Sequence, residues 1–258
     1  MSSAYGSITR PVSGQSLGTI LPRHATLIKR VNGEVPAATN SAPIAAVLFR
    51  ITSNESIDDA SRAFTLGAST HSTLVEAMHQ VFNNEVEKGD TYPQEFVLDE
   101  TQFHNYFFSG DAFVLLKGNY SNAAEVEKKP SKQEWEDDLL AYFYVKPNFP
   151  GRCSHICNGG FIVNPIHRGL GIGSILGKAF LKLVPVIGYK ASMFNLVFVS
   201  NTASIRLWRS LGFKEIGRIP KAGRLRGQGA DSLDEGYVDA IQFYWDFETM
   251  AVPAEYDA

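Results

Sequence analysis

A glycine-dense turn joins a short apolar run to an amphipathic helix, and this order constrains the fold more than any other feature of the chain. Residues 160–174 read Gly-Phe-Ile-Val-Asn-Pro-Ile-His-Arg-Gly-Leu-Gly-Ile-Gly-Ser. From position 172 to 184, apolar residues recur at alternating steps of three and one, which is typical of a helix with one buried face. Glycines let backbone amides converge on one point, and a helix N-terminus adds partial positive charge there. The stretch therefore predicts a phosphate-binding loop.

The spacing of the glycines excludes two common nucleotide-binding loops. A Rossmann loop needs G-x-G-x-x-G and an acidic residue ~20 positions later. Here Gly169, Gly171 and Gly173 are separated by single residues, and the next acidic residue is Glu215. A P-loop needs G-x-x-x-x-G-K-[ST], whereas Gly177-Lys178 is followed by alanine.

The element pattern predicts one α/β (α+β) domain. Residues 1–42 are rich in Ser, Gly, Pro, Thr and Ala and read as a tail or linker with an edge strand near 26–31, and residues 43–258 form the domain, with its core at 72–247. Strands are expected at 44–51, 112–116, 139–145, 160–164, 194–199, 213–219 and 238–247, and helices at 72–87, 99–107, 172–184 and 202–211. Antiparallel strands come first, and a strand–helix–strand–helix core follows, whose two strands should be parallel neighbours. Residues 53–67 and 121–137 read as exposed loops, and 224–236 as a glycine-rich excursion between the last two strands.

Composition narrows the partners and the compartment. The net charge of -3 argues against nonspecific nucleic-acid binding, and no apolar run reaches the ~20 residues that cross a bilayer. Two cysteines, in a chain of 258 residues, favour a reducing, cytoplasmic compartment. The alternative is mitochondrial, because residues 1–33 contain arginine, lysine and serine but no acidic residue.

Basic residues surround the glycine-dense turn. No carboxylate side chain occurs between Asp138 and Glu215. The same stretch carries Lys146, Arg152, Arg168, Lys178, Lys182, Lys190, Arg206, Arg209 and Lys214. A buried core with basic rims would explain this pattern, but the turn favours an anion-binding face.

Two motifs, taken in order, resemble a known superfamily. The turn fits R-x-x-G-x-G at Arg168, Gly171 and Gly173, and residues 201–213 read Asn-Thr-Ala-Ser-Ile-Arg-Leu-Trp-Arg-Ser-Leu-Gly-Phe. Together they resemble the pyrophosphate loop and the strand–Asn–helix–Gly-Phe signature of the GCN5-related N-acetyltransferase (GNAT) superfamily. The resemblance implies the GNAT acyl-CoA N-acyltransferase fold, a mixed, mostly antiparallel central sheet flanked by helices, and acetyl-CoA as cosubstrate. The cofactor-binding residues that it implies are Phe161, Ile162, Val163, Arg168, Gly169, Leu170, Gly171, Ile172, Gly173, Ser174 and Asn201.

Further segments resemble the fungal L-azetidine-2-carboxylate N-acetyltransferases, which acetylate and so detoxify proline analogues. They are residues 91–94, 143–148, 152–161, 194–201 and 238–241. The similarity spans roughly 72–247. The segments 121–137 and 224–236 look longer than that family needs, which bears on substrate choice more than on reaction type.

Three asparagines are candidates for contacts with the ligands. Asn158 precedes two glycines, so it could be a turn residue with left-handed geometry, but in the family the matching Asn contacts the substrate. Asn195 interrupts an apolar strand, where a buried amide must be hydrogen-bonded; it is either a structural amide or a substrate-orienting one, and the family favours the second. Asn201 suits a helix N-cap, and the superfamily implies that it also reaches the pantetheine arm.

The expected reaction is direct transfer from thioester to amine in a ternary complex. It needs a neutral amine, an acceptor for its proton and donors for the developing oxyanion. Because the core lacks carboxylates, we expect a neutral amine, an ordered water, or an outer-loop acid such as Glu95 or Asp99. Backbone amides near 161–163 would polarise the thioester, and Asn158 and Asn195 would orient the acceptor. Cys153, His155 and Cys157 lie too awkwardly spaced on one extended segment to favour a metal site.

The acceptor remains open between three hypotheses. The first is a small amino acid or amine, including a proline analogue such as L-azetidine-2-carboxylate. The second is a peptide or protein N-terminus, which would need an open groove. The third is a non-catalytic coenzyme A-binding module. A homodimer is one expectation for assembly.

Overall fold

The computed structural model describes Leu17, residues 23–27, 43–53, 62–229 and 234–253, and Tyr256. Most of the expected tail, including residues 28–31 of its edge strand, therefore lies outside the described residues. The strands are β1 (Arg23–Leu27), β2 (Ile44–Thr52), β3 (Thr65–Gly67), β4 (Asp111–Lys117), β5 (Leu139–Pro147), β6 (Ile156–Val163), β7 (Ala191–Phe198), β8 (Lys214–Arg226) and β9 (Glu235–Asp246). The helices are α2 (Ser72–Lys88), α3 (Glu100–Phe107), α4 (Ile172–Ile187) and α5 (Thr202–Ser210), with 3-10 turns η2 (Ala123–Glu125), η3 (Lys132–Trp135), η4 (Gly151–Cys153) and η5 (Pro165–His167).

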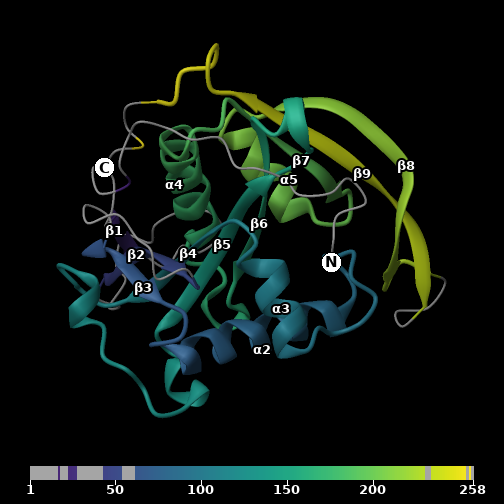
Figure 1. The fold of residues 1–258 in the computed structure, drawn as a ribbon. Coiled ribbons are helices and arrows are strands. Elements are labelled where there is room, and N and C mark those ends of the chain that lie inside the picture. The colour runs from purple at the N-terminus through teal and green to yellow at the C-terminus, as the bar shows by residue number, and fades with distance from the viewer. Residues whose placement is uncertain are drawn as a thin grey trace.

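One mixed sheet runs through the molecule, as expected. Within the described residues its order is β1-β2-β4-β5-β6-β7-β9-β8, with β3 beside β2 (Figure 1). The ladders are antiparallel except β2–β3 and β6–β7. The parallel β6–β7 pair confirms the predicted crossover through α4.

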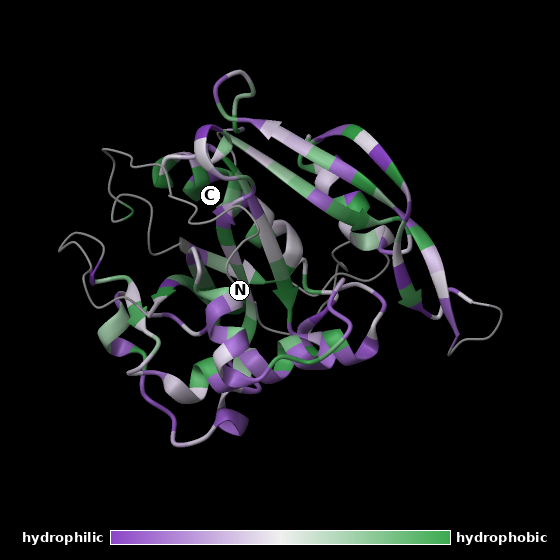
Figure 2. Cartoon of the chain, turned by 45° about the vertical axis from the view of Figure 1, so that its right-hand side comes forward, coloured by the Kyte–Doolittle hydropathy of each residue, from purple (hydrophilic) through white to green (hydrophobic). Residues whose placement is uncertain are grey.

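Helices cover both faces of the sheet. One apolar cluster joins α4 and α5 to the sheet and includes Phe180, Phe194 and Trp208. The other joins α2 and α3 to the opposite face and includes Phe82 and Phe103. In Figure 2, α2 and α3 carry many hydrophilic residues, whereas the central strands are largely hydrophobic. Each helix thus turns one stripe to the sheet, as its periodicity predicts.

The strands β6 and β7 separate after a short pairing. Only Ile156–Ala191 and Cys157–Ser192 are partners, although both strands continue well past these residues. A parallel pair that opens in this way leaves unpaired backbone groups facing the gap, and these need another hydrogen-bonding partner. The gap lies beside the start of α4, where the glycine-dense turn ends.

Several local predictions are confirmed. The helix expected at 72–87 is α2, and Asp99 caps α3 with its Oδ1 accepting from the N–H of Gln102 at 2.7 Å. Asn201 caps α5, accepting from the N–H of Ser204 at 3.1 Å. Gly212 ends that helix with φ 89°, a left-handed conformation that glycine adopts at little cost.

The loop predictions need three corrections. Residues 53–67 include the strand β3, because Thr65 and Leu66 bury themselves beside β2. Residues 121–137 are not simply exposed: Trp135 is buried, and its Nε1 donates to Thr73 Oγ1 at 3.0 Å. Both ends of the excursion at 224–236 continue the β8–β9 hairpin, whose ladder extends to Arg226 and Glu235.

Candidate active site

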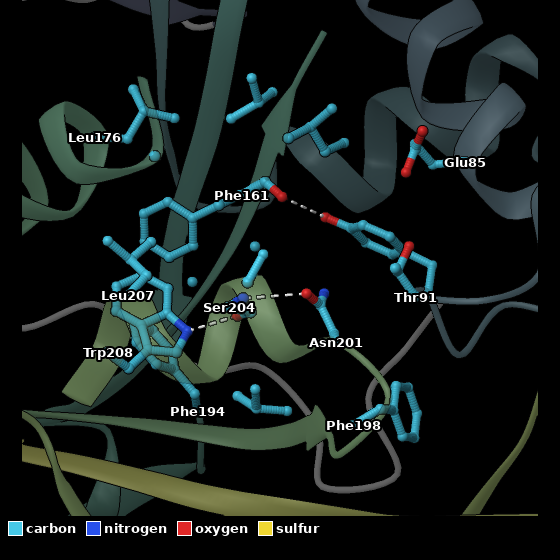
Figure 3. Close-up of a pocket in the computed structure, with 18 of the residues that line it drawn as sticks. Glu85, Thr91, Phe161, Leu176, Phe194, Phe198, Asn201, Ser204, Leu207 and Trp208 are labelled. Carbon is cyan, nitrogen blue, oxygen red and sulfur yellow. Dashed lines mark hydrogen bonds between the residues drawn. The ribbon is translucent and has the colours of Figure 1, made fainter. Parts of the chain in front are cut away.

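A cleft of about 830 Å³ opens between the separated strands, the glycine-dense loop, the end of α2 and the start of α5. In Figure 3, Glu85 and Thr91 lie on the right, Phe161 and Trp208 on the left, and Asn201 and Ser204 between them. The sequence-predicted residues that line it are Asn158, Phe161, Ile162, Val163, Arg168, Gly169, Gly171, Ile172, Gly173, Ser174, Asn195 and Asn201. Leu170 does not line the cleft and instead packs against the core on the α4 side.

The glycine-dense loop forms an anion cradle at one end of the cleft. Gly169 and Gly171 have φ of 85° and 75°, and a Cβ at either would meet no atom within 4 Å. Glycine is therefore needed there for conformation and not for space. The N–H groups of residues 169–171 make no hydrogen bond among the described residues, and those of residues 172 and 173 begin α4. These amides fit a diphosphate group.

The free edge of β6 forms the middle of the cleft. At the two ends of the β5–β6 ladder, the N–H of Asn148 donates to Ile156 O and that of Asn164 donates to Leu140 O. Since peptide groups alternate along an antiparallel strand, the N–H and C=O groups of Phe161 and Val163 point away from β5, toward the gap. An acyl thioester lying along this edge would meet backbone donors.

Aromatic side chains form the apolar floor of this gap. The rings of Phe161, Phe194 and Trp208 lie with centroids 4.4–5.7 Å apart. The indole Nε1 donates to Ser204 Oγ at 2.9 Å, which fixes the ring beside the start of α5. Trp208 and Phe180 are buried, as expected for core residues.

Three lining residues carry buried polar atoms without a hydrogen-bond partner among the described residues. They are Asp90 Oδ1, Thr91 Oγ1 and Ser200 Oγ. A buried polar atom that stays unsatisfied costs about 1–3 kcal/mol. Together with the cradle and the free strand edge, these atoms suit a long, polar ligand such as acetyl-CoA.

The two predicted acceptor-orienting asparagines lie at the other end of the cleft. Asn158 Oδ1 accepts from the N–H of Gly159 at 2.9 Å. Asn195 and Asn148 form a reciprocal amide pair, with Nδ2-to-Oδ1 distances of 2.9 and 2.5 Å. This pair satisfies one N–H and one oxygen lone pair of the Asn195 amide. The other N–H and the other lone pair remain available.

Three tyrosines that were not predicted as site residues also line the acceptor end of the cleft. Tyr92 donates to the carbonyl oxygen of Phe161 at 3.4 Å, and the hydroxyls of Tyr106 and Tyr144 lie 2.8 Å apart. All three line the cleft, and burial raises the pKa of each. They therefore remain neutral hydrogen-bonding groups at physiological pH.

A buried carboxylate, Glu85, lines the cleft beside them. Its Oε2 accepts from Arg168 Nη2 at 2.8 Å. The candidates expected from outer loops are engaged elsewhere: Glu95 pairs with Arg224 at 2.6 Å, Asp99 caps α3, and neither lines the cleft. A sequence signal for Glu85 existed, since it falls on the buried stripe of α2 that includes Met78 and Phe82.

Most of the basic residues that surround the loop in sequence do not line the cleft. Of the nine between Asp138 and Glu215, only Arg168 does so. Lys190 pairs with Glu248 at 2.9 Å, and Arg209 pairs with Glu215. The predicted anion-binding face therefore contributes one basic side chain, that of Arg168, to the cleft.

Among the described residues, no group of three or more His, Cys, Asp or Glu side chains could hold a metal ion, and Cys153 is exposed whereas Cys157 is buried. No helix in the described part of the chain is both long and apolar enough to span a bilayer.

Known proteins resemble the chain in sequence and in fold. Residues 96–213 match the family model described as the acetyltransferase (GNAT) family. N-acetyltransferase aca1 of Schizosaccharomyces pombe is 41% identical over 177 residues, covering 69% of this chain and 82% of that protein. A GCN5-related N-acetyltransferase from Kribbella flavida superposes with a TM-score of 0.54 at 25% identity, covering 67% of this chain and 92% of that one. Protein yncA of Salmonella typhimurium, solved with its cofactor acetyl-CoA, shares the fold with a TM-score of 0.52 at 16% identity, covering 70% and 93%.

Proposed function

This chain belongs to the GNAT family and is an N-acetyltransferase that uses acetyl-CoA, and from that premise we propose that its acceptor is the amine of a small amino acid. Proline analogues such as L-azetidine-2-carboxylate are the class that we propose first. Transfer is direct, with acceptor and acetyl-CoA bound together. The alternative acceptor is the N-terminus of a peptide or protein.

The observation that carries this proposal is a closing contact over one side of the cleft. The end of β8 reaches the segment after α2: the N–H of Arg226 donates to Gly89 O at 2.9 Å, and its Nη1 donates to Glu87 O at 2.6 Å. Arg224 pairs with Glu95 at 2.6 Å, and Gln228 lines the cleft. A peptide chain needs an open groove, and a contact beside the cleft favours a compact acceptor over a longer one.

We assign different residues of the cleft to binding acetyl-CoA, polarising its thioester and orienting the acceptor. When bound, acetyl-CoA supplies the acetyl group as an activated thioester. The backbone amides of residues 169–173 hold the diphosphate, and the side chain of Asn201 contacts the pantetheine arm while capping α5. Backbone N–H groups of Phe161 and Val163 stabilise the negative charge that develops on the carbonyl oxygen. Asn158 and Asn195 orient the acceptor, so that its nitrogen faces the carbonyl carbon.

Glu85 is the proton acceptor that we propose, directly or through one water. Its carboxylate lines the cleft and is buried, and its partner Arg168 stands at the start of the diphosphate loop. A bound diphosphate competes for Arg168, which would release Glu85 toward the amine. The neutral amine nitrogen forms the new bond to the acetyl carbon, and the carbon–sulfur bond breaks so that coenzyme A leaves as a thiolate. The proton of the amine passes to Glu85 and from there to the thiolate, which leaves as the thiol.

The test is product detection by mass spectrometry after incubation with acetyl-CoA. The acceptors are cyclic amino acids, linear amino acids and peptides that begin with the same residues. Acetylated cyclic amino acids are the expected products. Acetylation of peptides with no product from any free amino acid would overturn the proposed acceptor class.

A further inference from the structure

A lysine that no other part of the site explains borders the acceptor end of the cleft. Lys146 lies near the end of β5 and is half-buried. Its Nζ sits 4.2 Å from the ring centroid of Tyr106 and 4.5 Å from that of Tyr144. Both rings line the cleft whereas Lys146 itself does not, so the ammonium group lies behind the two phenols at the border of the cleft. Cation–π contacts of this kind fix the position of the charge.

This ammonium group has no carboxylate partner. None of the ion pairs among the described residues includes Lys146, and nearby acids are occupied: Asp111 pairs with Arg50 at 2.9 Å, and Glu95 pairs with Arg224. Burial lowers the pKa of Lys146 to about 8. A partly desolvated cation without a counter-ion is costly, and a bound anion would remove that cost.

The strand register places this cation with the acceptor-orienting amide. Lys146 is the direct partner of Asn158 in the β5–β6 ladder, so the two side chains stand on the same face of the sheet. Tyr144 lies two residues earlier in β5, on that same face. An ammonium group, an amide and two phenols thus meet at the end of the cleft opposite the diphosphate loop.

We propose that Lys146 binds the α-carboxylate of the acceptor and so makes the enzyme select amino acids over simple amines. This inference rests on the proposed function. The carboxylate lies against the ammonium group, and the ring or side chain of the amino acid lies against the phenols. Its α-nitrogen then faces the thioester end of β6, one or two bonds from the anchored carboxylate.

The test compares an amino acid with the same molecule lacking its carboxylate. The measured quantity is kcat/KM for L-azetidine-2-carboxylate and for azetidine, in the wild type and in Lys146→Met, whose side chain has similar length and no charge. The wild type should prefer the amino acid. In K146M, kcat/KM for the amino acid should fall by about 10- to 100-fold, through KM, while the value for azetidine stays unchanged.

Two controls separate this role from a structural one. Lys178→Met removes another lysine that lies over an aromatic ring, with its Nζ 5.0 Å from the Tyr256 ring centroid. This substitution should leave kcat/KM unchanged for both acceptors. Lys146→Arg should recover part of the preference. An equal loss for both acceptors in K146M, or a preference that survives it, overturns the inference. If the wild type acetylates no amino acid at all, the proposed function itself is wrong.

Discussion

Glu85 on α2 and Arg168 at the start of the diphosphate loop form an ion pair of 2.8 Å across the cleft. The glutamate side chain is 7% exposed and the arginine 47%, so the carboxylate depends on this partner more than the guanidinium does. The pair links the helix that borders the acceptor end to the loop proposed to hold the cosubstrate.

Substitutions of the two partners should have opposite effects. Arg168→Gln should weaken acetyl-CoA binding by about tenfold, because a charge-assisted contact to the diphosphate is lost. Glu85→Gln should leave this affinity unchanged or tighter, since Arg168 is released, while kcat falls because the proton acceptor is lost. Calorimetric titration and steady-state kinetics measure the two effects. A similar loss of acetyl-CoA affinity in both variants would show that the Glu85–Arg168 ion pair has only a structural role.

The parts of the site that follow from local sequence were the predictable ones. The diphosphate loop and the Asn201 cap depend on residues within a few positions of one another, and the chain order alone predicted the parallel β6–β7 pair. Glu85 and Tyr106 reach the cleft only because α2 and α3 pack on the face of β5 and β6. No local sequence pattern predicts that Glu85 and Tyr106 line the same cleft.

Other features were not predicted for the same reason, because they depend on contacts between residues far apart in sequence. Asn195 was expected to be either a structural amide or a substrate-orienting one, but its hydrogen-bond partner Asn148 lies 47 positions away in sequence, and no local pattern predicted that pairing. Strands at 213–219 and 238–247 were expected, but the far end of the β8–β9 ladder, which reaches Arg226 and Glu235, was expected as a loop because glycines and charges dominate it. Its pairing and its contact with the segment after α2 are tertiary features, which composition does not report.

The glycine cradle predicts a specific effect on binding. Gly171→Ala forces a side chain into a left-handed conformation, which costs about 1–2 kcal/mol and disturbs the amides of the loop. Acetyl-CoA affinity should fall. Gly151→Ala is the matched control, because Gly151 also has positive φ and open space but does not line the cleft. Both variants should lose similar thermal stability, and equal affinities in both would contradict the assignment of the cradle.

The amide pair predicts coupling between Asn148 and Asn195. Asn148→Ala removes the partner that holds the Asn195 side chain, so KM for the acceptor should rise by about three- to tenfold with little change in the KM for acetyl-CoA. Asn195→Ala should have at least as large an effect. Steady-state kinetics with both substrates varied gives these values. Unchanged acceptor kinetics in N195A would exclude an orienting role for Asn195.

The lowered pKa of Lys146, about 8 because of burial, predicts a pH-dependent preference. The ammonium form binds a carboxylate and prevails below this pKa, so the ratio of kcat/KM for L-azetidine-2-carboxylate to that for azetidine should be constant at lower pH and fall above about pH 8. The groups packed on the ammonium are the phenols of Tyr106 and Tyr144, whose raised pKa values keep them neutral there. A ratio that is flat across this range would contradict the prediction.

The cleft is proposed to accept a small free amino acid and to exclude longer acceptors. The most direct measurement compares kcat/KM for L-azetidine-2-carboxylate with that for a dipeptide that begins with the same residue. We predict a large preference for the free amino acid. We also predict that Arg226→Ala, which removes the hydrogen bond to Glu87 O, reduces this preference because the dipeptide can then enter. Equal or better turnover of the dipeptide by the wild-type enzyme would contradict the proposed acceptor.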